Sequence, residues 1–124
     1  MSDIPADLHY TSDHEWVRTN GSLLTVGITA YAADALGDVV YVDHPAVGST
    51  ITAGAIVGEV ESTKSVGEIF APVSGTVTET NPAVVDDPEL INRDPYGEGW
   101  LFTVETTEQP ELMDANAYRA LIGE

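Results

Sequence analysis

The sequence predicts a mostly β fold: a small sandwich or flattened barrel with short peripheral helices and a C-terminal helix. Short runs rich in branched side chains recur along the chain, and turns containing glycine or proline separate them, which is typical of β-strands. No long helical segments stand between these runs, so a parallel α/β sheet is not expected. The length of 124 residues suits one domain, which we predict to cover residues 1–124.

The first half of the chain contains three predicted strands and one predicted helix. In order, they are a strand at 23–28, a helix at 30–36 with Thr29 as its N-cap and Gly37 as its stop, a strand at 38–43 that ends before His44-Pro45, and a short strand near 50–52 between turns at Gly48 and Gly54. The helix boundaries follow from the capping preference of threonine and the ability of glycine to end a helix.

Two alternating runs in the middle of the chain predict a β-hairpin. The residues that share one face are Ile56, Gly58 and Val60 in the run 56–61, and Gly67, Ile69, Ala71 and Val73 in the run 66–73. Residues 62–65 join the runs as a short polar connection of the kind that closes a hairpin. Lys64 is the only lysine in the chain, and we expect it at the exposed tip of this hairpin.

The last part of the chain adds strands, short helical turns and a terminal helix. In order, we predict a turn at 71–75, a strand at 76–80, a loop or short helical turns from Asn81-Pro82 through 88–92, a turn at 94–97, a strand at 100–106 and a helix at 111–122. The helix is predicted because Leu112, Ala115, Tyr118 and Ile122 recur at helical spacing.

The charge of the chain excludes some classes of partner. Asp and Glu number 21 against 4 Lys and Arg, so the formal net charge is -17. This argues against nucleic acid, because Lys and Arg supply most of the affinity for phosphates. The acidity fits docking onto basic partner surfaces, and it equally fits solubility or adaptation to a salty interior.

The beginning of the sequence shows neither a secretory signal nor a transit peptide, and no apolar stretch is long enough for a membrane span. A cytoplasmic protein that does not bind membranes is expected. The absence of cysteine excludes disulfides and thiolate metal sites. His9, His14 and Glu15 match no zinc spacing, so no metal is expected. The two tryptophans, Trp16 and Trp100, are predicted to pack in the core or at its edge.

Six short stretches follow one another along the chain: His14–Val17, Val26–Thr29, Leu36–Val40, Val60–Ser65, Ala71–Gly75 and Asn92–Trp100. In their order and spacing they are similar to the H-protein family of the glycine cleavage system, and the similarity extends over nearly the whole chain. The resemblance implies a lipoyl-type hybrid fold.

Within this resemblance, Lys64 takes the position of the family's lipoylated lysine, so the implied cofactor is lipoate, covalently attached to Lys64. Glu61 precedes the lysine by three residues and Gly75 follows it by eleven, and both match features that lipoylating enzymes are thought to recognise. Methionine flanks the lysine on both sides in biotin carriers, whereas Thr63 and Ser65 do so here. These neighbours argue against biotin.

The resemblance also implies a carrier and not an enzyme, with no catalytic residues. The lipoyl arm would take the aminomethyl group of glycine from a pyridoxal-phosphate-dependent glycine decarboxylase to a tetrahydrofolate-dependent aminomethyltransferase. An FAD enzyme, dihydrolipoyl dehydrogenase, would reoxidise the arm, and a lipoate ligase or octanoyltransferase would attach it. The carrier is expected to be a monomer. By the same resemblance, Glu15 and Glu68, with Asp13 close by, lie at the cleft in which the arm rests.

Two other functions remain open at this point. An H-like protein could serve mainly as a lipoyl donor or relay in lipoate assembly, because that role needs the same lysine. An unmodified β-domain that only binds partners is the second, although a lone lysine at a hairpin tip argues against it.

Overall fold

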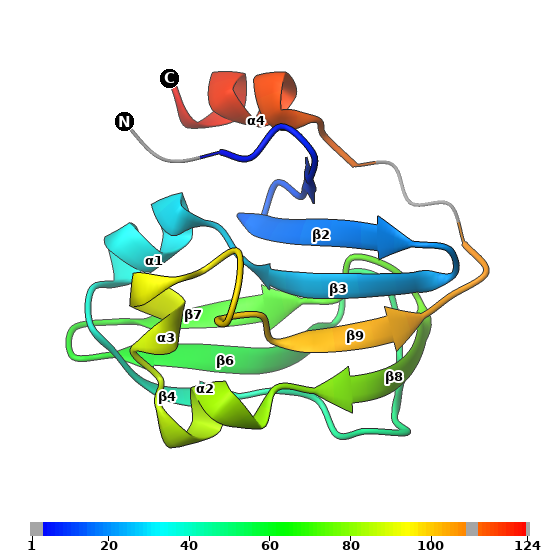
Figure 1. Cartoon of the computed structure of the whole chain (residues 1–124), viewed down its shortest axis with the longest axis horizontal. Helices are drawn as coiled ribbons and strands as arrows, with labels where there is room; N and C mark the ends of the chain where they lie inside the picture. Colours follow the sequence, from blue (N-terminus) through cyan, green and yellow to red (C-terminus); the bar gives the residue numbers. More distant parts are fainter. Residues whose placement is uncertain (1–3, 109–111, 124) are drawn as a thin grey trace.

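The computed structural model describes residues 4–108 and 112–123. Its elements run in the order β1 (His9–Tyr10), β2 (Glu15–Asn20), β3 (Leu23–Ile28), α1 (Ala30–Leu36), β4 (Val39–Asp43), β5 (Thr50–Ile51), β6 (Ile56–Ser62), β7 (Val66–Phe70), β8 (Gly75–Thr80), α2 (Pro82–Asp86), α3 (Leu90–Arg93), β9 (Phe102–Glu105) and α4 (Ala115–Ile122) (Figure 1). The mostly β fold with short helices and a C-terminal helix is confirmed.

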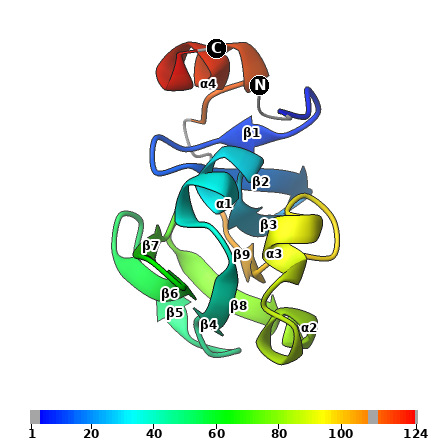
Figure 2. The same cartoon turned by 90° about the vertical axis from the view of Figure 1, so that its left-hand side faces the viewer.

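The strands form two antiparallel sheets. One sheet has the order β1-β2-β3-β9-β8-β5, and the other has the order β4-β6-β7. Neither order closes on itself, so the molecule is a sandwich and not a barrel. The views in Figures 1 and 2 show the smaller sheet lying across one face of the larger one, with α1, α2 and α3 along one side.

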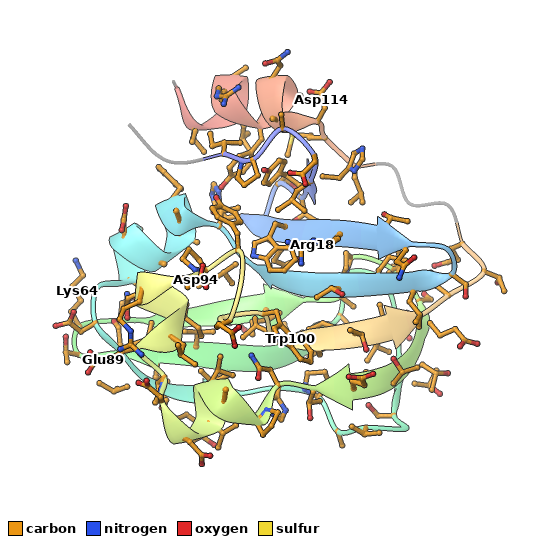
Figure 3. All side chains as sticks on the ribbon, viewed as in Figure 1. Arg18, Lys64, Glu89, Asp94, Trp100 and Asp114 are labelled. Atoms are coloured by element: carbon orange, nitrogen blue, oxygen red, sulfur yellow. The ribbon has the colours of Figure 1, made fainter. Side chains whose placement is uncertain are left out.

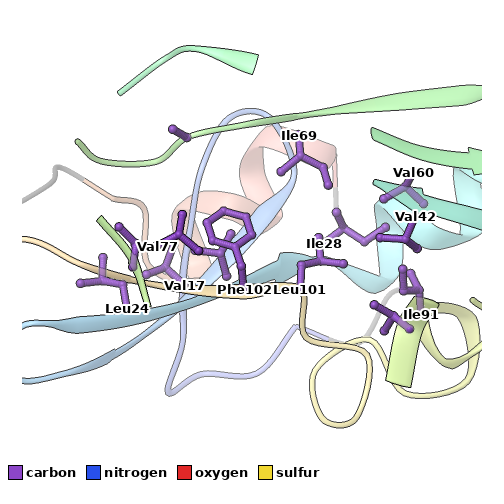
Figure 4. Packing of buried hydrophobic residues seen from close by; sticks show 14 of the residues in the cluster. Val17, Leu24, Ile28, Val42, Val60, Ile69, Val77, Ile91, Leu101 and Phe102 are labelled. Carbon is purple, nitrogen blue, oxygen red and sulfur yellow. The ribbon is translucent and has the colours of Figure 1, made fainter. Parts of the chain in front are cut away.

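The main core lies between the two sheets. Val60 and Ile69 of the smaller sheet and Ile28 and Phe102 of the larger one are almost completely buried in one cluster (Figure 4). Branched and aromatic side chains are favoured at such inward positions, since they fill the space between two pleated surfaces. This packing fixes the β6–β7 hairpin on the larger sheet.

A second cluster joins the terminal helix to the larger sheet. Tyr10, Trp16 and Tyr118 are fully buried in it, and α4 lies over β1 in both views. The Trp16 indole covers Gly27 so closely that a Cβ there would lie 2.5 Å from a ring atom. Trp100 is half-buried against the same cluster. The predicted packing role of both tryptophans is therefore confirmed.

Most strand and helix predictions are confirmed, and the differences lie near the N-terminus and at the ends of elements. β1 and β2 were not predicted, although Asn20-Gly21, which spans the end of β2 and the start of the turn to β3, is a typical hairpin signal. The strand predicted at 66–73 ends at Phe70, and α4 begins at Ala115 because Asp114 caps it. Residues 109–111, which include the predicted start of this helix at 111, lie outside the described residues.

One predicted side-chain orientation on the hairpin was wrong. Ile56 was expected to share a face with Val60, but its side chain is exposed. The pairing register shifts between Ile56 and Gly58, and such an irregularity turns the residues before it to the other face.

No helix in the described part of the chain has both the length and the apolar character needed to cross a membrane.

Candidate functional site

Lys64 lies in the turn between β6 and β7, and its side chain is exposed, as predicted. Figure 3 shows it at one end of the molecule. Both ion pairs found among the described residues belong to Arg93, so the Lys64 amine has no carboxylate partner there. The pattern of two alternating runs around a polar connection thus located the lysine correctly.

Ser62 shapes the turn that carries Lys64. Its hydroxyl accepts hydrogen bonds from the backbone N–H groups of Lys64, at 3.3 Å, and Ser65, at 3.0 Å. The Ser62 N–H also donates to the Ser65 carbonyl at 2.8 Å, which closes the hairpin. Serine side chains stabilise turns in this way. The lysine therefore extends from an ordered base and not from a loose loop.

The tip is also tied to the segment that follows α1. The Thr63 N–H donates to the Asp38 carbonyl at 3.1 Å. Asn92 of α3 holds the same segment, because its amide donates to the Gly37 carbonyl and accepts from the Val39 N–H. A Cβ on Gly37 would lie 3.1 Å from Lys64 Cε, so the lysine stem passes close to the end of α1.

A cleft of about 260 Å³ lies beside this end of α1. Its walls come from α1, β7 and the segment before β2, and they include Tyr31, Leu36, Gly67, Ile69 and His14. Gly67 matters for its shape, because a Cβ there would lie 3.3 Å from the Leu36 side chain. The cleft is mainly apolar and adjoins the hairpin that carries Lys64.

The structure places two of the three carboxylates predicted for this region on the cleft. Asp13 and Glu68 both line it, and both are exposed. They can hold a cationic group at its rim through charge-assisted hydrogen bonds. Sequence spacing alone does not predict that they meet, since Asp13 precedes β2 and Glu68 lies on β7.

Glu15 does not line this cleft, and its role in holding the arm stays a prediction. Its side chain is only 1% exposed, and it lines a separate hollow of about 300 Å³ that shares Asp13 with the cleft. Its carboxyl accepts from the Phe70 N–H at 2.6 Å and from the Thr11 hydroxyl at 3.3 Å. Burial raises the pKa of Glu15 to about 8, against the lowering effect of the Phe70 hydrogen bond.

Glu61 and Gly75 lie in different environments. Glu61 is half-buried on β6, three residues before the lysine, and pairs with Val66 across the hairpin. Gly75 is the first residue of β8, and Figure 1 shows that β8 and the β6–β7 turn lie toward opposite ends of the molecule. A Cβ on Gly75 would lie 2.3 Å from the Glu105 carbonyl oxygen. The close approach of β9 therefore gives Gly75 a packing reason of its own.

The cleft walls and the turn-forming role of Ser62 were not predicted from the sequence. A serine three residues before Ser65 is a signal for such a turn, but the walls depend on contacts between distant segments.

No group of three or more His, Asp or Glu residues that could hold a metal occurs in 4–108 and 112–123.

Comparisons with known proteins all lead to one family. A family model described as "Glycine cleavage H-protein" matches residues 8–124. The glycine cleavage system H protein of Thermobifida fusca is 58% identical over 119 residues, covering 95% of this chain and 94% of that protein. The protein of that name from Mycobacterium avium is 53% identical and both chains are covered at 100%. The crystal structure of a glycine cleavage system H protein from Mycobacterium marinum has a TM-score of 0.92 at 48% identity, covering 98% of this chain and 100% of that one.

Proposed function

The chain belongs to the glycine cleavage H-protein family, and we propose that it is the lipoyl-bearing carrier of the glycine cleavage system and not an enzyme. The observation that carries this proposal is the exposed Lys64 amine on an ordered hairpin tip beside an apolar cleft. A carrier needs one modifiable amine on a stiff base, and Lys64 is the only lysine in the chain.

The residues around Lys64 fit a covalently bound lipoyl group. The amine is exposed and free of ion pairs in the described part of the chain, so it is open to acylation. Leu36, Ile69 and Tyr31 offer apolar walls for a hydrocarbon arm. Burial of apolar surface is favourable at roughly 25 cal/mol per Å², so an arm of this chemistry gains from resting in the cleft.

When attached, the dithiolane of lipoate supplies the carrier chemistry, taking up the aminomethyl group of glycine and passing it on. The residues of the chain hold the arm and shield the group that it carries. Ser62 keeps the attachment point in one turn, and Asp13 and Glu68 face a cationic cargo at the cleft rim. Glu15 supports this site from behind, since its own carboxyl is buried and hydrogen-bonded to β7.

Three partner enzymes belong to the proposal: a pyridoxal-phosphate-dependent glycine decarboxylase, a tetrahydrofolate-dependent aminomethyltransferase and an FAD-containing dihydrolipoyl dehydrogenase. One tethered arm gives each of them a high effective concentration of the transferred group. A lipoate ligase or octanoyltransferase would load Lys64, and Glu61 is the neighbour proposed to guide it. For Gly75 the recognition role stays a prediction beside its packing role.

Attachment is tested by intact mass before and after treatment with a lipoate ligase. The wild-type chain should gain one lipoyl group, and Lys64→Arg should gain none. Glu61→Gln should be loaded more slowly, whereas Glu79→Gln, an exposed glutamate on β8, is the matched control. A wild-type chain that gains no lipoyl group under conditions that load a known carrier would refute the proposal.

The shielding role is tested by the rate at which the aminomethyl-loaded protein releases ammonia. Asp13→Asn with Glu68→Gln should speed the release by removing both carboxylates from the rim. Glu15→Gln is predicted to have a smaller effect alone, because Glu15 does not line the cleft itself. Equal release rates in the wild type and the double variant would remove these residues from the proposal.

A further inference from the structure

One buried hydroxyl links the terminal helix to the cleft. Tyr118 of α4 is 0% exposed, and its hydroxyl oxygen lies 2.8 Å from His14 Nδ1 and 2.8 Å from Thr29 Oγ1. His14 lines the cleft, and Thr29 is the N-cap of α1, which forms one of the cleft walls. Figure 2 shows α4 on one side of the β1–β2 segment and α1 on the other.

The His14 ring is held from several directions. Its ring centroid lies 5.0 Å from that of Tyr31 and 5.7 Å from that of Tyr118. The His14 backbone has a φ of 67°, which is uncommon for a residue with a side chain. The Thr29 N–H donates to the His14 carbonyl at 3.0 Å and fixes that backbone. His14 and Thr29 are therefore connected in two ways, by a direct backbone hydrogen bond and through the hydroxyl of Tyr118.

Counting donors and acceptors favours one arrangement of the protons in this group. Thr29 is fully buried, and its oxygen already accepts from the Ala32 N–H at 3.2 Å. Its own hydroxyl hydrogen then has the Tyr118 oxygen as acceptor. In that arrangement the Tyr118 hydrogen is directed to His14 Nδ1, so the imidazole carries its proton on Nε2. The reverse arrangement would leave the buried Thr29 hydrogen without this acceptor.

We propose that Tyr118 is a positioning residue of the cleft: its hydroxyl donates to His14 Nδ1 and keeps His14 as the neutral Nε2–H tautomer. The inference rests on the proposed function, in which the cleft receives a cationic cargo. A charged imidazole in the wall would repel that cargo and would compete with it for Asp13 and Glu68. The terminal helix thus acts on the wall of the cleft through one hydrogen bond.

The electrostatic surroundings of His14 agree with a neutral ring. Burial lowers the pKa of His14, and the neighbouring carboxylate of Asp13 opposes this effect without cancelling it. The other titratable groups at this position are Glu68, which lines the same cleft, and the phenols of Tyr31 and Tyr118.

Nitrogen-15 NMR of the histidine rings in the unloaded protein tests the proposal directly. His14→Gln identifies the His14 signals. The wild type should show His14 protonated at Nε2 and accepting at Nδ1. Tyr118→Phe should convert this into a mixture of tautomers and shift the pKa of His14 upward. Tyr10→Phe is the matched control, since Tyr10 stacks on Tyr118 at 4.8 Å but its hydroxyl donates to the Pro5 carbonyl.

A wild-type His14 with its proton on Nδ1 would overturn the proposal, and this result needs no variant to fold. An unchanged tautomer and titration in Tyr118→Phe would overturn it as well. Ammonia release from the loaded protein then distinguishes the retention role of the cleft from the positioning role of Tyr118. Near pH 6, the loaded Tyr118→Phe protein should release ammonia about fivefold faster than the loaded wild type. This factor corresponds to the loss of one hydrogen bond. If the NMR result holds while release is unchanged, the retention role of the cleft fails and the positioning role stands.

Discussion

Lys64 and Glu15 lie in opposite surroundings. The Lys64 amine is exposed on a turn that Ser62 orders, so it is reachable by other enzymes. The Glu15 carboxyl is buried and bonded to the Phe70 N–H, which connects β2 of the larger sheet to β7 of the smaller one. The first side chain suits the proposed attachment, and the second joins the two sheets through its hydrogen bond to β7.

The buried carboxyl gives the fold a specific pH dependence. The pKa of Glu15 is about 8 in the folded chain against an ordinary value of 4.5. Between these values the folded protein binds a proton that the unfolded chain has lost, so the free energy of unfolding falls as the pH rises. The free energy of unfolding falls by about 1.4 kcal/mol per pH unit. The stabilisation by the protonated Glu15 carboxyl is fully present only below the pKa that Glu15 has in the unfolded chain.

Urea unfolding of the wild type and Glu15→Gln near pH 5.5 and near pH 8 measures this dependence. The wild type should lose up to about 3 kcal/mol more than the variant over this range. The comparison cancels the titration of the other groups, because both proteins share them. Parallel losses in the two proteins would show that Glu15 is ionised in the folded state.

The functional residues differed in how far the sequence could predict them. Lys64 was predictable because a single lysine between two alternating runs is a local pattern. The burial of Glu15 and the Tyr118–His14 hydrogen bond were not, because their partners lie 55 and 104 residues away. Local patterns carry no information about which distant segment covers a side chain, and that covering decides the pKa and the tautomer.

At the scale of elements, the β6–β7 hairpin forms part of the cleft, and α4 contacts one of its walls. The hairpin contributes a wall and the lysine, and α4 supplies Tyr118, whose hydroxyl lies 2.8 Å from Nδ1 of the cleft residue His14. Elements with clear periodicity or caps, such as α1 between Thr29 and Gly37, were predicted from sequence. β1 was not, because two residues are too short for any pattern and their pairing with β2 depends on the whole sheet.

The capping of α4 gives a prediction for this element. Asp114 accepts from the Ala117 N–H at 2.8 Å, so Asp114→Ala should lower the free energy of unfolding by about 1 kcal/mol. Hydrogen exchange in α4 should become faster in the same variant. Asn116→Ala, an exposed change in the same helix, should stay within about 0.5 kcal/mol of the wild type. Equal effects of the two changes would contradict the capping role.

At the scale of the whole molecule, the dominant feature is a net charge of -17. Of the four basic residues, Arg93 alone forms ion pairs in the part of the chain that the structure describes, with Asp87 and Glu89. Arg18 lies over the Trp16 ring instead, at 5.1 Å. Most carboxylates among residues 4–108 and 112–123 therefore have no ion-pair partner, and they repel one another within the fold.

This repulsion predicts a salt dependence. Raising NaCl from about 10 mM to about 500 mM shortens the screening length several-fold, so the free energy of unfolding should rise on the order of 1 kcal/mol. Urea unfolding at the two salt concentrations measures the change. The rate of encounter with a partner enzyme should fall over the same range, and a salt-independent rate would assign the acidity to solubility alone.

The central claim is that Lys64 carries the arm that works in glycine cleavage. It is tested most directly by the exchange of labelled bicarbonate into the carboxyl group of glycine, catalysed by the pyridoxal-phosphate-dependent decarboxylase. The lipoylated wild type should support this exchange, whereas the unmodified protein and ligase-treated Lys64→Arg should not. A lipoylated protein that is correctly loaded on Lys64 and still supports no exchange would contradict the claim and would favour a role as lipoyl donor.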